Sequence, residues 1–414
     1  MIPSRTVAER MPVTVRAEVP RECHDLCRMR RSIRARSRLR PDASLQWGVR
    51  LMRILHLADT HLDRVFGAAE DRRDAARRRT GLRDALSRAL AAGRVEGVDA
   101  VVLAGDVYEH ASVTADTVAF LARELERAAV PVLVTPGNHD PHVAGSAWQL
   151  TAWPANVHVF TADRVEPFEL AGDVVVWGAA FCAATAPAGV PDGFVAPADG
   201  RTHLLALHAA LTGERWADEG RHRSVTRAQL EATGAARILL GHFHDGYDDD
   251  LLCYPGSPEP LGWGERHGNH GASLVTIDGG RVTARHIPIA TRRYVERAVS
   301  VAGAASSADV EAIATAAAAS EAGACLRLVL EGEIAPGCAV DLDALSERLG
   351  DGLEELVLVD RTRPAYDLEA IARERSVRGR SVARMLRSDN PAAGEAVLAG
   401  LRALDGHAEV LGAR

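Results

Sequence analysis

Five apolar runs recur between residues 53 and 240, and polar residues follow each of them. The runs cover residues 53–58, 100–104, 131–135, 204–207 and 238–240. Short runs of this kind, bounded by Gly, Asp, Asn or His, predict buried strands. Sheets of buried strands with helical crossovers collect polar residues at the carboxyl ends of their strands. The pattern therefore predicts an α/β fold in which five loops converge on one site.

Beyond residue 290 the pattern changes, and Ala, Leu, Val, Glu and Arg dominate the composition. The periodicity there predicts helices over residues 307–319 and 342–349 and strands over residues 326–330 and 356–359. Together these elements suggest a small α+β domain over residues 291–362.

The last part of the chain, residues 363–414, is expected to form a helical tail. Apolar residues at helical spacing predict one helix over residues 366–386 and another over residues 394–404. An amphipathic helix commonly packs on its own domain, so this spacing by itself does not require a partner.

The polar residues that follow the five runs can hold metal ions. They are Asp59-Thr60-His61, Gly105-Asp106, Gly137-Asn138-His139-Asp140, His208 and Gly241-His242-Phe243-His244. Two divalent cations about 3.5–4 Å apart can clamp a phosphate and lower the pKa of a water, and such a pair needs a bridging carboxylate. Asp106 is the candidate for that role. Mixed nitrogen and oxygen ligands favour Mn, Fe or Zn, whereas sites for Mg or Ca are mostly oxygen.

Each of these segments has a simpler interpretation when it is taken alone. An isolated Asp-x-His or Gly-Asp is more often a turn or a helix cap, and a single histidine such as His208 is more often a core residue. The complete set in this order favours the metal site, and hence a hydrolase of phosphate esters.

The five segments, in this order over residues 59–244, resemble the motifs of the calcineurin-like metallophosphoesterases. The resemblance implies a four-layer α/β/β/α sandwich over residues 52–290. It implies a first metal held by Asp59, His61, Asp106 and His244, and a second held by Asp106, Asn138, His208 and His242. It also implies that His139 protonates the leaving oxygen, with Asp140 orienting it.

A further stretch resembles one branch of that superfamily. Residues 253–265 read Cys-Tyr-Pro-Gly-Ser-Pro-Glu-Pro-Leu-Gly-Trp-Gly-Glu, and residues 52–62 open the domain in a matching way. Both are similar to SbcD-type nucleases, the nuclease subunits of bacterial double-strand-break repair complexes. The resemblance implies a DNA exonuclease or endonuclease that uses two divalent ions, with Mn²⁺ expected and Fe, Zn or Mg as alternatives.

The same resemblance bears on partners. It implies that residues 291–362 form a cap domain that selects DNA, and that the tail holds an SMC-like ATPase of the SbcC type. Members of the family often pair as homodimers. In archaeal and eukaryotic relatives a histidine stands three residues after the bridging aspartate. Here that residue is Glu109, as in many bacterial members, and His110 follows it without an assigned role.

Charge divides the chain in two. The first 51 residues hold 12 arginines and 5 acids, a net of +7, and the rest holds 37 arginines and 51 acids, a net of −14. We interpret residues 1–51 as a disordered extension or a misassigned start, because Met52 begins the family's usual amino terminus. The acidic remainder predicts weak duplex binding outside a local patch. Arg64, Arg72, Arg73 and Arg77–Arg79 are candidates for that patch, although such a run is commonly a solvated helix face.

Composition sets the remaining bounds. A length of 414 residues allows two to three domains, and six scattered cysteines fit reduced thiols in a cytoplasm. No apolar segment of the sequence has the length of a membrane span or the form of a signal peptide.

Two other classes of function stay open. One is a phosphoesterase for small molecules such as nucleotides or cyclic nucleotides, which would cleave a model diester or a mononucleotide but not DNA. The other is a subunit whose main work is to bind a coiled-coil ATPase. A neighbouring gene for such an ATPase would favour complex formation.

Overall fold

The computed structural model describes residues 51–66, 72–170, 173–183, 191–213, 223–265 and 267–404, and at residues 72–74 it describes the backbone alone. The chain divides into two units, residues 1–48 and 49–414, and all described residues belong to the second. Our prediction for the basic extension therefore lies outside the described residues, except for Leu51.

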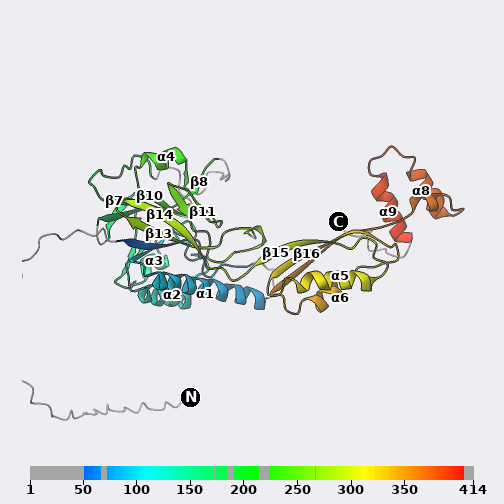
Figure 1. Cartoon of the computed structure of the whole chain (residues 1–414), viewed down its shortest axis with the longest axis horizontal. Helices are drawn as coiled ribbons and strands as arrows, with labels where there is room; N and C mark the ends of the chain where they lie inside the picture. The colour runs from blue at the N-terminus through cyan, green and yellow to red at the C-terminus, as the bar shows by residue number, and fades with distance from the viewer. Residues whose placement is uncertain are drawn as a thin grey trace, which may run out of the picture. The chain divides into compact units, whose positions relative to one another are not determined.

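Two six-stranded sheets form the larger part of the described chain (Figure 1). The first has the order β14-β13-β1-β2-β3-β4, and the second has the order β11-β12-β10-β7-β6-β5. The strands of the first sheet are β1 (Met52–Leu57), β2 (Ala100–Leu103), β3 (Val132–Val134), β4 (Val157–Val159), β13 (Gly271–Asp278) and β14 (Arg281–Pro288). Those of the second are β5 (Glu166–Glu169), β6 (Val174–Gly178), β7 (Thr202–His208), β10 (Arg237–Gly241), β11 (Tyr247–Asp248) and β12 (Leu252–Tyr254).

All five strands expected from the apolar runs are present, and they pair in parallel within their sheets. β1 pairs with β2, β2 with β3, and β7 with β10. Parallel strands of this kind are buried on both faces, which explains why their sequences are continuously apolar rather than alternating.

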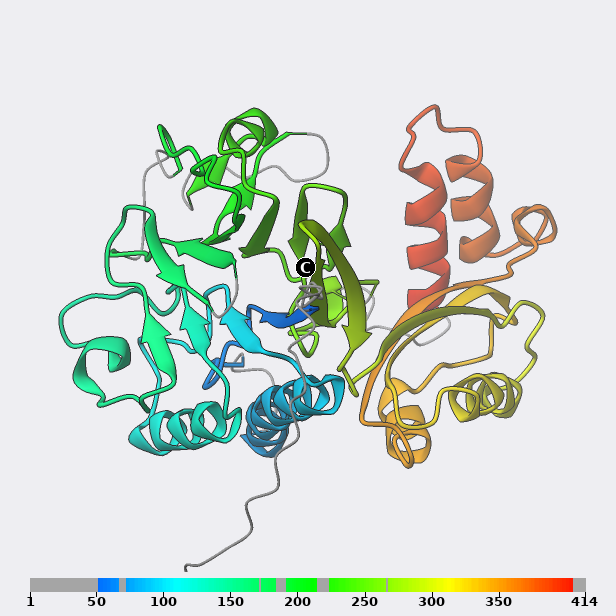
Figure 2. The ribbon, with the colours of Figure 1, turned by 60° about the vertical axis from the view of Figure 1, so that its left-hand side comes forward.

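The two sheets pack against each other, and helices cover their outer faces. One apolar cluster joins Ile54 and Leu133 of the first sheet to Leu204 and Leu239 of the second. Successive strand residues point to opposite faces, so Leu55 and Leu57 join a separate cluster with helices α1 (Arg72–Glu96) and α2 (Ala115–Arg127). Figure 2 shows both helices against the first sheet.

On the other side of the sandwich, Leu205, Leu207 and Leu240 of the second sheet pack with Leu230 of helix α4 (Arg227–Ala232). Short elements complete this part: α3 (Ala147–Leu150), the 3₁₀ helix η1 (Trp263–Glu265) and the paired strands β8 (Ala210–Leu211) and β9 (Ser224–Val225). The order helix, sheet, sheet, helix is the four-layer α/β sandwich that we expected.

A third sheet has three parallel strands in the order β15-β16-β17. They are β15 (Tyr294–Ser300), β16 (Cys325–Ile334) and β17 (Glu355–Pro364), connected through helices α5 (Ser307–Ala319) and α6 (Leu342–Leu349). Both helices and the two later strands were expected from the sequence. β15 was not, because six of its seven residues are exposed or half-buried and its apolar residues are interrupted by Glu296 and Arg297 instead of forming a continuous run.

The tail contains α7 (Leu368–Ala372), α8 (Val377–Met385) and α9 (Ala393–Leu404). Our prediction of one continuous helix over residues 366–386 is wrong, whereas the helix over residues 394–404 is confirmed. α7 ends at Ala372, and α8 begins after Ser376, which caps it because the Ser376 hydroxyl accepts a hydrogen bond from Gly379 N at 2.9 Å.

The apolar residues of the tail helices face one another. Ile371, Val382, Val397 and Leu401 form a cluster of their own. This packing accounts for their helical spacing without a partner, and the ATPase partner stays a prediction. Within the residues that the structure describes, no helix has the length and apolar character needed to cross a bilayer.

His56 lies in the interior of the first sheet. It is fully buried, and its Nδ1 lies 3.5 Å from Cys253 Sγ. Burial, together with the charge of Arg237, lowers the pKa of His56 to about 3. The folded protein therefore holds this histidine neutral at neutral pH.

We predict that acid destabilises the wild-type protein more than a His56→Gln variant. The unfolded histidine titrates near pH 6.5 and the folded one near pH 3, so this stabilisation is complete above pH 6.5 and is lost as the pH falls toward 3. Between about pH 7.5 and about pH 4.5 the loss amounts to about 3 kcal/mol. Urea unfolding of both proteins at the two pH values measures it. An equal loss of unfolding free energy in the wild type and the His56→Gln variant would contradict a buried neutral His56.

Candidate metal centre

Loops at the carboxyl ends of β1, β2, β3, β7 and β10 carry the seven predicted metal ligands. Backbone hydrogen bonds join these loops: Asp59 N donates to Gly105 O at 3.0 Å, and His61 N donates to Asp106 O at 2.9 Å. The two sheets also meet directly here, because His242 N donates to the Asp59 carboxylate at 3.0 Å. The structure therefore brings together residues that lie up to 185 positions apart in the sequence.

The backbone of these loops is strained. Asp59, His61 and Asp106 have φ angles of 54°, 45° and 53°, and His242 has 114°. Residues other than glycine rarely adopt such angles, at a cost of about 1–3 kcal/mol each. Gly241 is required for a different reason, since a Cβ atom there would lie 1.9 Å from Ala104 O. Strain of this kind commonly accompanies a functional site.

The first group of ligand atoms consists of Asp59, His61 and His244, whose atoms lie within 4.8 Å of one another. The two histidines face each other, with their Nε2 atoms 3.1 Å apart. His244 Nε2 lies 4.0 Å from Asp59 Oδ1. Asp59 and His61 are buried, and His244 is partly exposed.

The second group consists of Asp106, His208 and His242, again within 4.8 Å. Asn138 adjoins it, with its Oδ1 3.1 Å from His208 Nε2. Asp106 Oδ2 lies 3.2 Å from His208 Nε2 and 3.8 Å from His61 Nε2 of the first group. One carboxylate thus contacts both groups, which is the position that a bridging ligand requires.

Hydrogen bonds on the outer side of three histidines determine which nitrogen faces the site. His61 Nδ1 lies 2.8 Å from Glu109, His244 Nδ1 lies 2.7 Å from Glu265, and His208 Nδ1 lies 2.8 Å from Ala104 O. Since these oxygens can only accept, each Nδ1 carries a proton, and Nε2 is the ring nitrogen that faces the site and can bind a metal ion once it is deprotonated. Buried lone pairs and carboxylates that face one another need a cation between them, so this donor set fits divalent metal ions.

The electrostatics of His208 support the same conclusion. Burial lowers the pKa of this histidine, but the charge of Asp106 and its hydrogen bond outweigh burial and raise the pKa to about 9. The site therefore attracts positive charge, which either a proton or a metal ion can provide. A metal ion that binds to His208 Nε2 has to displace that proton.

His139 lies beside these groups with a side chain that is 40% exposed. Its backbone N donates to Asp106 Oδ1 at 2.9 Å, and its Nδ1 lies 2.7 Å from Glu109 Oε2. The hydrogen bond to Glu109 raises the pKa of His139. Burial would raise the pKa of Glu109, but its hydrogen bonds to His139 and His61 lower it to about 2. Glu109 therefore keeps a proton on His139, as a general acid requires.

Asp140 differs from our expectation that it orients His139. Its buried carboxylate accepts hydrogen bonds from three backbone groups, Asp106 N at 2.9 Å, Val107 N at 2.9 Å and Gly137 N at 2.7 Å. Trp148 Nε1 donates to it as well, at 3.2 Å. Asp140 thus holds the backbone of two ligand loops, and the carboxylate that contacts the His139 ring belongs to Glu109.

Glu109 and Glu265 are site residues to which the sequence analysis assigned no role. A signal existed for both: Glu109 stands three residues after Asp106, and Glu265 ends the stretch that resembled SbcD-type nucleases. His110 contributes its backbone, since its N donates to His139 O at 2.8 Å.

The candidate arginine patch is only partly available. Arg78 is buried, its guanidinium donates to Leu261 O at 2.6 Å, and it stacks on Phe66. Arg64 lies 3.9 Å from Glu109. Of the others in the run, Arg77 is exposed and Arg79 is half-buried. Arg78 therefore serves packing, which leaves fewer cations beside the site for DNA than the sequence suggested.

Comparison with known proteins agrees with this site. Residues 52–246 match the family model of the calcineurin-like phosphoesterases. The match includes all seven predicted ligands, so the part of the chain that holds the site is similar to the calcineurin-like metallophosphoesterases, and this similarity supports metal-dependent hydrolysis of phosphoesters.

Individual relatives are distant. The chain is similar to the uncharacterized metallophosphoesterase YhaO of Bacillus subtilis (strain 168), with 27% identity over 242 residues, which are 55% of this chain and 58% of the relative. The match thus spans less than two thirds of that relative's length. The crystal structure of TT1561 of Thermus thermophilus aligns with a TM-score of 0.36 and 14% identity, covering 57% of this chain and 99% of the other.

We predict that Glu265→Gln weakens metal binding by about 10- to 100-fold, the usual cost of losing a group that supports a ligand. Glu265 accepts from His244 with one oxygen and from Leu261 N at 2.7 Å with the other. A glutamine can accept only one of these bonds. Calorimetric titration with Mn²⁺ measures the change. Glu369→Gln, which removes an exposed carboxylate on α7, is the matched control. Equal affinities for the two variants would show that Glu265 does not support His244.

Proposed function

We propose that this metallophosphoesterase is a DNA nuclease of the SbcD type, acting in double-strand-break repair and recombination. The observation that carries the proposal is the position of Glu265. The stretch over residues 253–265, which resembles SbcD-type nucleases, folds back so that its last residue contacts His244. The sequence feature that favours the nuclease branch is thus part of the metal centre itself.

The chain's own residues have distinct tasks in phosphodiester hydrolysis. Two divalent ions at the centre, which we propose to be Mn²⁺, would polarise the phosphate and activate water. Asp106 joins the two ligand groups, and His61, His208 and His244 present Nε2 to them. His139 has its Nδ1 engaged by Glu109, so its Nε2 is the atom that can deliver a proton to the departing sugar oxygen.

The rival proposal is a phosphoesterase for small molecules. The net charge of −14 over residues 52–414 and the burial of Arg78 both favour it, because each lowers the attraction of the domain for a polyanion. The two proposals share the metal centre and its chemistry. They differ in whether DNA is a substrate at all.

We predict that His139→Ala retains metal but loses hydrolysis by about 10²- to 10⁴-fold, the usual contribution of a general acid. Asp106→Ala should lose both, because both ligand groups depend on its carboxylate. The assay is Mn²⁺-dependent cleavage of end-labelled single- and double-stranded DNA, with bound metal measured on the same samples. His286→Ala, an exposed histidine on β14, is the control.

The outcomes separate the proposals. Undiminished cleavage by His139→Ala would remove this residue from catalysis. No cleavage of DNA by the wild-type protein, with a chromogenic diester or a mononucleotide still hydrolysed, would replace the nuclease by a phosphoesterase for small molecules.

A further inference from the structure

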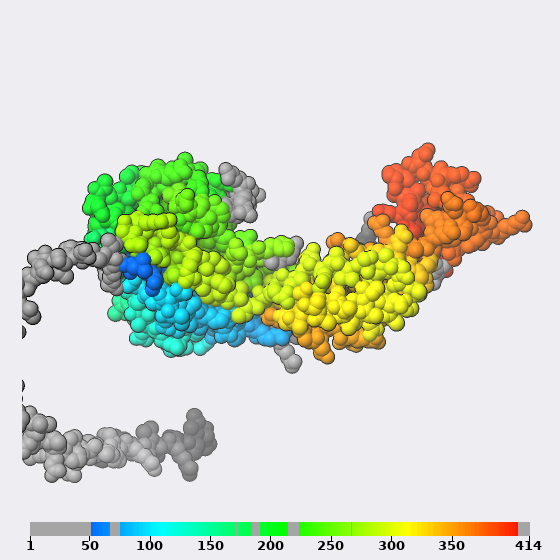
Figure 3. Space-filling model, viewed as in Figure 1, coloured from blue at the N-terminus to red at the C-terminus, as the bar shows by residue number. Residues whose placement is uncertain are grey.

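The tail contains a concentrated run of positive charge that is separate in sequence from the arginine run on α1. Residues 373–387 hold six arginines and one glutamate, a net of +5, within a chain whose residues after 51 have a net charge of −14. Arg380 and Arg384 lie on α8, and Arg387 follows the C-cap residue Leu386. All three side chains are exposed. Figure 3 shows this segment, in orange, at the molecular surface.

The three arginines form a stripe on one side of α8. Arg380 and Arg384, four residues apart, lie on the same helical face, and Arg387 continues this run of charge in the turn after the helix. The opposite side is buried, because Gly379 and Val382 pack inward, and the position of a Cβ atom on Gly379 would lie 2.4 Å from Glu374 O. The apolar side of α8 therefore packs in the core of the tail, and the arginine stripe faces outward.

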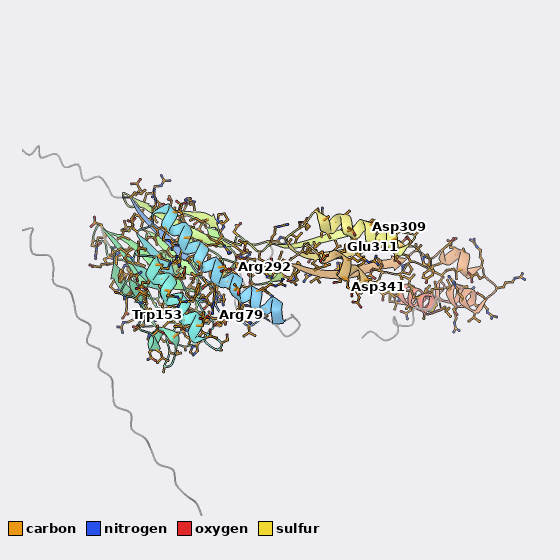
Figure 4. All side chains as sticks on the ribbon, turned by 90° about the horizontal axis from the view of Figure 1, so that it is seen from below. Arg79, Trp153, Arg292, Asp309, Glu311 and Asp341 are labelled. Carbon is orange, nitrogen blue, oxygen red and sulfur yellow. The ribbon has the colours of Figure 1, made fainter. Side chains whose placement is uncertain are left out.

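Ion pairing within the protein does not explain the stripe. Arg164 and Arg293 each lie 2.7 Å from a carboxylate, and Arg348 pairs with Glu311, which is labelled in Figure 4. Arg380, Arg384 and Arg387 have no such partner among the residues that the structure describes. Like charges at this spacing destabilise a helix by about 0.2–0.5 kcal/mol per pair, so the stripe does not serve folding.

We propose that the stripe formed by Arg380, Arg384 and Arg387 binds the phosphate backbone of a nucleic acid. A polyanion relieves the repulsion among the three charges, and guanidinium groups suit phosphate oxygens. The stripe spans about 10 Å along the helix, which corresponds to about three phosphates of one DNA strand. The proposal rests on the proposed nuclease function, and it adds a contact for DNA outside the acidic domain that holds the metals.

The test compares two double variants of the full chain with the wild type. Arg380→Ser/Arg384→Ser removes two charges from the stripe. Arg94→Ser/Arg281→Ser removes two exposed charges from the ends of α1 and β14, at the amino edge of the first sheet. Fluorescence anisotropy with a labelled 30-base-pair duplex of arbitrary sequence, in chelator, measures binding without turnover. The basic residues before 51 are present in all three proteins, so their contribution to DNA binding is the same in each and does not affect the comparison.

The stripe variant should bind duplex about tenfold more weakly at about 0.1 M salt. The plot of the logarithm of its association constant against the logarithm of the salt concentration should become less steep by about 2. The control should match the wild type. Equal duplex affinities of the stripe variant and the wild type at every salt concentration would overturn the proposal. The exposed side of α8 would then face either an acidic protein or solvent. Such a result would not affect the nuclease proposal, which depends on cleavage. Conversely, DNA binding that depends on the stripe, without DNA cleavage, would overturn the nuclease proposal and support the phosphate-binding role of the stripe.

Discussion

The Asp106 carboxylate, shared between two groups of histidines, is the interaction on which the rest of this domain depends. It lies 3.2 Å from His208 Nε2 and 3.8 Å from His61 Nε2, in an interior where an uncompensated charge would be costly. Its own backbone has a positive φ, and its N–H donates to Asp140. The buried Asp140 thus holds the strained loop in place, and the loop in turn holds the carboxylate between the two groups.

The two-sheet architecture explains how one site can draw on distant segments. Asp59, Asp106 and Asn138 follow strands of the first sheet, whereas His208 and His242 follow strands of the second. Packing of the two sheets through Ile54, Leu133, Leu204 and Leu239 brings both sets of carboxyl ends to the same edge. A change that separates the sheets would therefore separate the ligand groups, and stability and metal binding are linked in this domain.

Much of the fold was predictable because each ligand follows an apolar run, and continuous apolar runs identify doubly buried strands. Spacing could not show that Glu109 and Glu265, rather than Asp140, contact the histidine rings, because those contacts depend on how loops fold back in three dimensions. The break between α7 and α8 was missed for a local reason: the capping hydroxyl of Ser376 outweighs the helical periodicity around it. β15 was missed because its sequence has no continuous apolar run, and its pairing with β16 determines its structure.

Electron paramagnetic resonance of the Mn²⁺-loaded protein tests the central claim most directly, because it reports whether two ions share a ligand. If Asp106 joins the two groups, two Mn²⁺ ions bind per chain and give the spectrum of a spin-coupled pair, which Asp106→Asn alters. A spectrum of isolated, uncoupled Mn²⁺ at full occupancy would contradict a shared carboxylate and the two-metal chemistry that depends on it.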